Sequence, residues 1–416
     1  MRAPADIATP QRRALDLVRE VAKEKGCHPF LVGGPVRDLL LRRASTDVDV
    51  TLEDGASTLA RALARRTEGR VRSFPQFLTY KVTAENWPEI DIATARTERY
   101  RQPGALPAVS PGKLHEDLLR RDFSINAIAM DLIDGSLHDP TGGEADLRNR
   151  IVRVLHDQSF IDDPTRIFRA VRLATRLGFS FDDTTSALMR GAIEGGALET
   201  ITKERIWREL FLAMEESEAP RVLATLVEVG ALAPLFGKRT AELLRLESAG
   251  HQIVRNPSLD RTVMFTAALL YGDASPVDLE GSGFSQKRAR NVIQIANEVA
   301  RFIDALEEAK GERQRLRLLK QASPEMLSAI SLVSADEKEH VERYVQFARF
   351  TLGIRGNDLE MPGGPHIARA LERTREAVFT GEITLEQART FAREMAMKYL
   401  ESGATAPEAG VRSEGK

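Results

Sequence analysis

A glycine turn followed by two acidic residues constrains this chain more than any other feature of its 416 residues. Phe30 to Val32 predict a short buried strand, after which Gly33 and Gly34 permit a turn that residues with side chains would resist. Pro35 favours the first position of a helix, which we expect over Val36 to Arg43. Because a helix N-terminus offers free backbone N–H groups and the positive end of a dipole, this turn is a candidate phosphate site.

Asp47 and Asp49 follow in an apolar stretch, where we expect a strand over Asp47 to Thr51. Alternate side chains of a strand share a face, so the two carboxylates would point the same way. Neighbouring carboxylates repel each other unless a cation lies between them, and hard oxygen ligands beside a phosphate suit Mg²⁺. The order of strand, glycine turn, helix and Asp-x-Asp strand therefore predicts a site for a metal ion and a triphosphate.

The segments GGPVRD and DVDV, in this order, resemble the signature of the polymerase-β-like nucleotidyltransferases. In this form they resemble the class II tRNA nucleotidyltransferase and bacterial poly(A) polymerase family. The resemblance implies that Asp47 and Asp49 are catalytic and hold Mg²⁺. It also implies that Gly33, Gly34 and Arg37 receive the triphosphate of ATP or CTP, and that tRNA is the acceptor.

A third carboxylate is expected beside this pair, because nucleotidyl transfer needs metal ions that activate a 3′-hydroxyl and neutralise the triphosphate. Glu89 to Ala95 predict a strand in which Asp91 faces away from Ile90 and Ile92. In the family the third acidic residue precedes an Ala-Arg pair, as Asp91 precedes Ala95-Arg96 here, so the resemblance makes Asp91 catalytic. The structural alternative is an ordinary acidic residue on an edge strand.

A second motif lies within Leu118 to Met130, where Arg121 and Asp122 are followed by Asn126. The segment resembles the family's RRDxxxNA motif. There the arginine contacts the nucleotide, while the Asp and Asn hold its sugar and the backbone. Taken alone, an Arg-Arg pair is more often part of a solvated surface.

A third motif begins at Asp163, which precedes Pro164 and predicts the N-cap of a helix. Arg166, Arg169 and Arg172 recur every three residues along that helix, and a cap with surface arginines is the structural alternative. Cytosine and adenine share a ring-nitrogen acceptor beside an amino donor, which one Asp and one Arg could read together, whereas uracil and guanine would mismatch both. The family resemblance gives this role to Asp163 and Arg166, and nucleotide contacts to Arg169 and Arg172.

The fold class that follows is α+β, with a polymerase-β-like head of mixed sheet and helices and an all-α C-terminal half. We expect the catalytic head over 1–155 and a helical, base-reading neck over 156–215. A helical body and tail that bind tRNA would follow over 216–400, and a disordered tail over 401–416.

Within the head, apolar periodicity predicts a helix over 11–25 and strand structure over 71–82. Residues 127–133 and 136–138 predict a hairpin. Residues 96–118 contain proline and glycine without periodicity, and we expect a mobile loop that helps to reorient the base-reading site between nucleotides. After Asp163 the pattern is helical to about residue 400.

Composition narrows the class of protein further. The net charge of −2 gives the protein no overall attraction to nucleic acid. An RNA partner would therefore have to bind a local basic surface. The lone Cys27 rules out an intrachain disulfide, and no apolar run is long enough to span a bilayer. We therefore expect a cytoplasmic protein with no membrane partner, while its oligomeric state stays open.

The most specific function that the sequence predicts is the transfer of CMP and AMP from CTP and ATP to the tRNA 3′ end. Addition of CC only, of A only or of poly(A) remains open, although residues 74–109 resemble the A-adding branch and lack the basic segment of poly(A) polymerases. Alternatives from other classes are a non-catalytic RNA-binding module and a His-Asp phosphohydrolase. The latter would use His138-Asp139 and His156-Asp157, but it needs these ligands on helices.

Overall fold

The computed structural model describes residues 9–45, 47–236, 259–272 and 274–402. The chain divides into two compact units, the first of 1–244 with 279–283 and the second of 245–278 with 284–416. The expected boundaries at residues 155 and 215 both fall inside the first unit and stay predictions. Of the disordered tail expected over 401–416, residues 403–416 lie outside the described residues.

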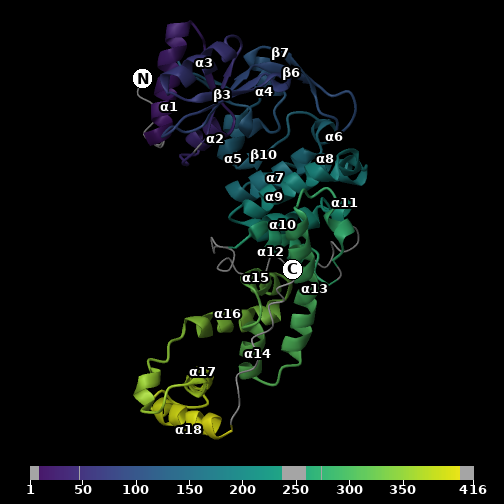
Figure 1. The fold of residues 1–416 in the computed structure, drawn as a ribbon. Helices are drawn as coiled ribbons and strands as arrows, with labels where there is room; N and C mark the ends of the chain where they lie inside the picture. The colour runs from purple at the N-terminus through teal and green to yellow at the C-terminus, as the bar shows by residue number, and fades with distance from the viewer. Residues whose placement is uncertain (1–8, 46, 237–258, 273, 403–416) are drawn as a thin grey trace, which may run out of the picture. The chain divides into compact units, whose positions relative to one another are not determined.

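A seven-stranded mixed sheet forms the centre of the first unit, in the order β3-β4-β5-β2-β1-β8-β9 (Figure 1). Its strands are β1 (Phe30–Val32), β2 (Val48–Leu52), β3 (Arg70–Phe74), β4 (Thr79–Thr83), β5 (Ile90–Thr94), β8 (Ala129–Asp131) and β9 (Leu137–His138). Strands β2 and β5 are parallel, and the other neighbouring pairs described in this sheet are antiparallel. The mixed sheet expected for the head is confirmed.

Helices α1 (Thr9–Lys25) and α3 (Ala56–Arg66) pack against each other and against this sheet. The helix expected over 11–25 is thereby confirmed, and its apolar stripe of Leu15, Val18 and Val21 is buried. Burial of such a stripe is what stabilises an amphipathic helix on a sheet, since propensity alone contributes little.

Two local expectations need adjustment. Helix α2 spans Gly34–Leu40, so it begins two residues before the expected helix over 36–43 and ends three residues earlier. The strand structure expected over 71–82 is interrupted by a 3-10 turn at Pro75–Phe77, and Leu78 adopts a φ of 54°. Because Pro75 has no N–H to donate, the ladder breaks there and the chain reverses into the β3–β4 hairpin.

The expectation that residues 96–118 lack regular structure is wrong. Strands β6 (Arg96–Arg99) and β7 (Ala108–Pro111) form an antiparallel hairpin, and helix α4 (Leu114–Leu119) follows. Pairing between β6 and β7 gives the backbone N–H and C=O groups hydrogen-bond partners. The segment can therefore form strands without an alternating pattern of apolar side chains in its sequence. Its mobility stays a prediction.

The rest of the first unit is mainly helical. Its further elements are η2 (Ser124–Asn126), α5 (Gly143–Asn149), α6 (Ser159–Asp162), α7 (Thr165–Leu177), α8 (Asp183–Glu194), η3 (Ala197–Thr200), α9 (Lys203–Glu215), α10 (Ala219–Glu228) and α11 (Ala233–Phe236). Helices α7, α9 and α10 pack together (Figure 1). The fully buried Trp207 lies edge-on to Phe236. Strand β11 (Ser180–Phe181), which pairs in parallel with β10 (Ile151–Val152), departs from the helical expectation after Asp163.

The described part of the second unit is helical, as expected for the C-terminal half. It contains α12 (Arg261–Leu269), η6 (Pro276–Leu279), α13 (Gln286–Glu307), α14 (Glu312–Leu319), α15 (Pro324–Val333), α16 (Ala335–Arg349), η7 (Gly356–Leu359), α17 (Pro365–Phe379) and α18 (Ala388–Glu401), Leu279 itself belonging to the first unit. Helices α17 and α18 enclose a small core around Ala370 and Ala392. Across the described residues, we find no helix with the length and apolarity that crossing a membrane requires.

Candidate active site

The parallel pairing of β2 with β5 gathers three of the predicted acidic residues. Asp49 on β2 is the register partner of Asp91 on β5, and Asp47 immediately precedes β2. The alternate residues of both strands, Val48, Val50, Ile90 and Ile92, are buried. Because side chains alternate along a strand, the carboxylates of Asp49 and Asp91 point to the opposite face, side by side.

These carboxylates disturb each other electrostatically. Burial, together with the negative charges of Asp91 and Asp47, raises the pKa of Asp49 to about 6. Lys81 is the register partner of Asp91 on β4, and its Nζ lies 3.5 Å from Asp91 Oδ1. Lys81 and Arg121 oppose the rise in the pKa of Asp49 without cancelling it. The site therefore carries excess negative charge that a cation would relieve.

The donor set fits a divalent cation, because carboxylate oxygens are the ligands that hard divalent ions take. Within the described ranges, no three His, Cys, Asp or Glu side chains already stand close enough to hold an ion together. Asp47 and Asp49 remain the candidate metal ligands.

The glycine turn lies under the guanidinium of Arg121. Gly33 adopts a φ of 73°, and a Cβ added there would meet Arg121 Nη1 at 2.8 Å. Arg121 Nη2 donates to Asp117 Oδ2 at 2.9 Å, and its Nε is buried without a hydrogen-bond partner among the described residues. The positive φ favours glycine, and a side chain at this position would push the guanidinium of Arg121 aside, so the turn and the arginine of the second motif form one feature.

Asp117, which sequence analysis missed, holds Arg121 in place. Its side chain is fully buried and also accepts from Arg120 Nη2 at 2.7 Å and from the backbone N–H of Arg96. Burial would raise the pKa of Asp117, but Arg121 and Arg120 outweigh it and lower the pKa. Its position four residues before Arg121, one helical turn away, was the available signal.

A hydrogen-bonded chain runs from the glycine turn to helix α7. The buried Arg37 donates from Nη1 to Asn126 Oδ1 at 2.7 Å, and Asn126 Nδ2 donates to Asp122 Oδ1 at 3.0 Å. Arg169 Nε then donates to Asp122 Oδ2 at 3.0 Å. Burial alone would raise the pKa of Asp122, yet Arg169 and Asn126 lower it to about 2. Asp122 is thus a permanent anion that ties α7 to the head.

A cavity of about 220 Å³ opens beside this chain, somewhat smaller than the roughly 300–1,000 Å³ typical of small-molecule sites. Seven predicted site residues line it: Gly34, Arg37, Asp47, Asp122, Asn126, Arg169 and Arg172. Four further residues complete the lining: Phe123, Leu173, Arg176 and Glu216. Arg176 was missed, although it lies one helical turn beyond Arg172 on the same face. Four arginines around one cavity suit an anionic ligand.

The predicted base-reading pair is not part of this cavity lining. Asp163 Oδ1 accepts from Thr165 N at 3.2 Å and from Arg205 Nη2 at 2.8 Å. The N-cap of α7 is Pro164 and not Asp163 as expected, since α7 begins one residue later, at Thr165. No described residue donates to Asp163 Oδ2. Arg166 is buried, with Nη1 donating to Ser159 Oγ at 2.7 Å and Nη2 to the Arg120 carbonyl at 3.0 Å.

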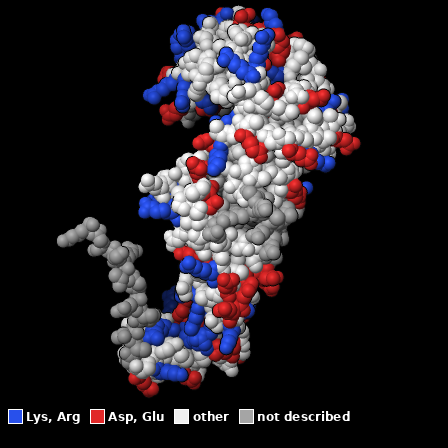
Figure 2. All heavy atoms as spheres, turned by 90° about the vertical axis from the view of Figure 1, so that its right-hand side faces the viewer, with Lys and Arg blue, Asp and Glu red and all other residues white. Residues whose placement is uncertain are grey.

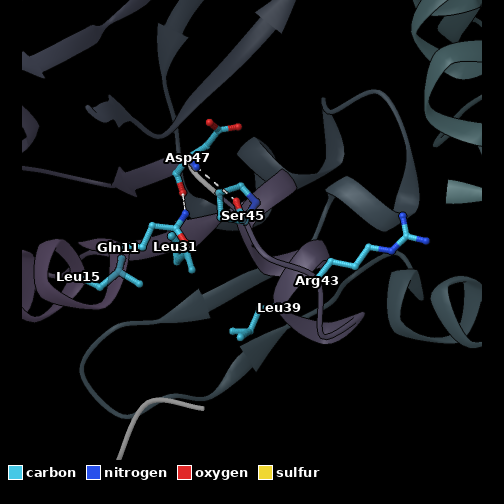
Figure 3. A pocket seen from close by; sticks show the side chains of 8 residues that line it. Gln11, Leu15, Leu31, Leu39, Arg43, Ser45 and Asp47 are labelled. Carbon is cyan, nitrogen blue, oxygen red and sulfur yellow. Dashed lines mark hydrogen bonds between the residues drawn. The ribbon is translucent and has the colours of Figure 1, made fainter. Parts of the chain in front are cut away.

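A smaller cavity behind the acidic residues shows how the start of β2 is held (Figure 3). Gln11 Nε2 donates to the Asp47 carbonyl at 2.9 Å, while the Asp47 carboxylate points away from Gln11. Gln11 is 5% exposed, so this hydrogen bond is largely shielded from water. A glutamine on the buried face of an amphipathic helix was the signal that sequence analysis overlooked.

The phosphohydrolase alternative gains no support from the described residues. His138 lies on β9 and not on a helix. Asp139 accepts from the backbone N–H groups of Gly143 and Glu144, so it caps the start of α5. A cap of this kind explains Asp139 without any metal.

Comparisons with known proteins agree with this geometry. The family model for the poly A polymerase head domain matches residues 29–153, and the model for a probable RNA and SrmB-binding site of polymerase A matches 178–243. The A-adding tRNA nucleotidyltransferase of Aquifex aeolicus is 44% identical over 197 residues, which is 47% of this chain and 24% of that protein. That of Geobacter sulfurreducens is 30% identical over 388 residues, 85% of this chain and 43% of the relative.

A multifunctional CCA protein from Nitrosococcus oceani is 41% identical over 211 residues, half of each chain. Among solved structures, the CCA-adding enzyme of Thermotoga maritima complexed with tRNA superposes with a TM-score of 0.71 at 25% identity. The match covers 96% of this chain and 97% of that one. The apo form I of a tRNA-processing enzyme gives 0.69 at 27% identity, covering 91% and 99%.

The fold and the acidic, arginine-lined site define a nucleotidyltransferase of the polymerase-β-like class. The chain belongs to the class II tRNA nucleotidyltransferase and bacterial poly(A) polymerase family. It spans between about a quarter and a half of the curated relatives compared above. Enzymes of this family typically require a divalent metal ion.

Replacing Asp49 with Asn should stabilise the metal-free protein at pH 8, by up to about 3 kcal/mol, because it removes a disfavoured buried charge. The folded pKa of about 6 lies above the ordinary 3.8, so the folded state retains a proton that the unfolded chain has lost. Wild-type stability should therefore fall as the pH rises through that interval. Urea denaturation in EDTA between pH 4 and 8 measures this.

The exposed Asp54 gives a matched control, since Asp54→Asn removes a charge outside the cluster. Asp49→Asn should lack the wild-type loss of stability between pH 4 and 6, whereas Asp54→Asn should retain it. If stability depends on pH in Asp49→Asn as it does in the wild type, the raised pKa of Asp49 is not the cause of the loss of stability.

Proposed function

We propose that this chain is a template-independent tRNA nucleotidyltransferase that adds CMP and AMP from CTP and ATP to the tRNA 3′ end. The observation that carries the proposal is the row of Asp47, Asp49 and Asp91 beside an arginine-lined cavity. We further propose Mg²⁺ as the divalent ion, held by Asp47 and Asp49. A tRNA acceptor would place the activity in the cytoplasm.

When bound, Mg²⁺ would neutralise the triphosphate and lower the pKa of the primer 3′-hydroxyl, so no separate general base is needed. Gly33 and Gly34 leave the backbone open to a phosphate, and Arg121 over the turn offers its unpaired Nε. Arg37 and the arginines of α7 would neutralise the remaining negative charge. Asp91 would complete the acidic set beside Asp49.

Asp163 and Arg166 are proposed to select the base. Asp163 Oδ2, which no described residue occupies, could accept from the amino group of cytosine or adenine. Arg166 keeps donors beyond those given to Ser159 and Arg120, and these could meet the ring nitrogen. Arg205 would hold Asp163 through Oδ1 while Oδ2 stays available.

The helical residues 216–400 are proposed to hold the tRNA. Lys and Arg side chains gather on the lower part of the face in Figure 2, next to Asp and Glu. Several basic side chains of this helical half are paired with carboxylates, as Arg317 and Arg313 are with Glu376. Phosphates would have to compete with such carboxylates, so binding should weaken steeply with salt.

Addition of the terminal A alone is the second candidate. Relatives named A-adding tRNA nucleotidyltransferases are 44%, 30% and 39% identical to this chain. Multifunctional CCA proteins are 38–41% identical over about half of it. The geometry described above suits either enzyme, because both add nucleotides of the same edge pattern.

Primers that end before CCA, after C and after CC separate these functions. The wild type should extend tRNA with labelled CTP or ATP only when a divalent ion is present. Asp47→Asn and Asp49→Asn should each lose at least about 100-fold in activity, since even residues that merely support metal ligands cost about 10–100-fold. Asp54→Asn is the control that should stay active. Near-normal extension by either site variant would remove the catalytic assignment, and extension of the CC primer alone would favour the A-adding enzyme.

Arg166→Gln tests base selection, because glutamine can still bond Ser159 but loses the charged donor. Discrimination against GTP and UTP should fall by about 1–3 kcal/mol, the value of one good edge contact. The measurement is kcat/KM for all four nucleotides on matched primers, with the exposed Arg190→Gln as control. A uniform loss with an unchanged nucleotide ranking would make Arg166 a structural residue.

A further inference from the structure

Arg43 reaches from the loop between α2 and β2 to the far end of helix α7. Its Nη1 donates to the Arg176 carbonyl and its Nη2 to the Leu177 carbonyl, both at 3.3 Å. These carbonyls belong to the last turn of α7, where the backbone C=O groups have no N–H donor within the helix. The positive guanidinium thus lies at the negative end of the helix dipole.

The backbone N–H groups that follow α7 bond to earlier carbonyls, so the Arg176 and Leu177 carbonyls are bonded by Arg43 instead. Gly178 N donates to the Thr175 carbonyl and Phe179 N to the Ala174 carbonyl, which closes the helix over the preceding residues. Such closure satisfies carbonyls one turn back and not the last two. Arg43 therefore completes the C-terminal cap of α7 from another element.

Helix α7 is attached to the head at three points. Arg166 donates to the Arg120 carbonyl near the N-terminus, and Arg169 pairs with Asp122 in the middle. Arg43 makes the third attachment, at the C-terminus. Two cavity arginines, Arg172 and Arg176, lie between the middle and the C-terminal attachment.

Arg43 itself stays outside the arginine-lined cavity. It lines the smaller cavity behind Asp47, together with Gln11, and its guanidinium extends away from both (Figure 3). The loop that carries Arg43 ends at Asp47, whose carbonyl Gln11 holds. One loop therefore links the metal-ligand candidate to the end of α7.

We propose that Arg43 is a positioning residue for nucleotide selection, which fixes the C-terminal half of α7 at a set distance from the acidic residues. The proposal rests on the proposed nucleotidyltransferase function, but its structural part does not. Without Arg43, α7 keeps its packing against α9 and α10 and its other two arginine contacts with the head, but its last turn loses the tie to the α2–β2 loop. Arg176 lies in that last turn and would be displaced most, whereas Arg172 stays paired with Glu209 and Glu216. Small displacements of positioning groups have large effects on transfer reactions.

Arg43→Met keeps the aliphatic stem and removes the donors, and Arg43→Lys restores one donor. The matched control is Arg42→Met, because Arg42 is exposed and its side chain bonds to no described residue. Hydrogen–deuterium exchange in the full-length protein should show the Gly178 and Phe179 amides exchanging about tenfold faster in Arg43→Met, the effect expected of one charge-assisted contact. Exchange on β2 should stay unchanged.

In the primer assay, Arg43→Met should raise KM for ATP about tenfold and lower the preference for ATP over GTP, with KM for tRNA unchanged. Arg43→Lys should recover part of both effects, and Arg42→Met should match the wild type. Unchanged amide exchange in α7 would show that Arg43 does not hold the end of this helix, even if the protein proves inactive. Faster exchange with unchanged KM and nucleotide preference would overturn the role in selection, while an inactive wild type would refute the proposed function instead.

Discussion

The parallel pairing of β2 with β5 is the constraint on which the site depends. It sets Asp49 directly beside Asp91, while the intervening apolar residues fix both strands in the core. A one-residue slip in register would turn the carboxylates into that core, so the apolar pattern enforces the acidic row. The raised pKa of Asp49 is the cost of this arrangement, and a cation would offset it.

Hydrogen-bonded polar side chains, buried at Arg37 and Asp122 and exposed at Arg169, then join the glycine turn to helix α7. The chain from Arg37 through Asn126 and Asp122 to Arg169 leaves each buried group with a partner, as burial of polar atoms requires. Removing Arg169 would leave the buried Asp122 carboxylate without its charged partner, which is more costly than breaking a fully exposed pair. The cavity shape therefore depends on charges that lie around it and not only on packing.

Sequence analysis could predict the acidic row because strand alternation is a local rule, and it found seven residues of the cavity lining. It could not find Gln11, Asp117 or Arg176, whose contacts join elements distant in sequence or extend a stripe past its motif. The β6–β7 hairpin was missed because paired backbone needs no periodic side chains. The motifs gave no sign that Asp163 and Arg166 would lie outside the arginine-lined cavity.

The central claim is that Asp47 and Asp49 hold a divalent ion against a nucleotide in the arginine-lined cavity. Crystals grown with Mn²⁺ and a non-hydrolysable ATP analogue test it most directly, because anomalous scattering locates the ion independently of the protein model. The account predicts an anomalous peak within about 2.0–2.3 Å of carboxylate oxygens from both Asp47 and Asp49, with the triphosphate over the turn at Gly33. An ion bound elsewhere, or a nucleotide away from this turn, would contradict it.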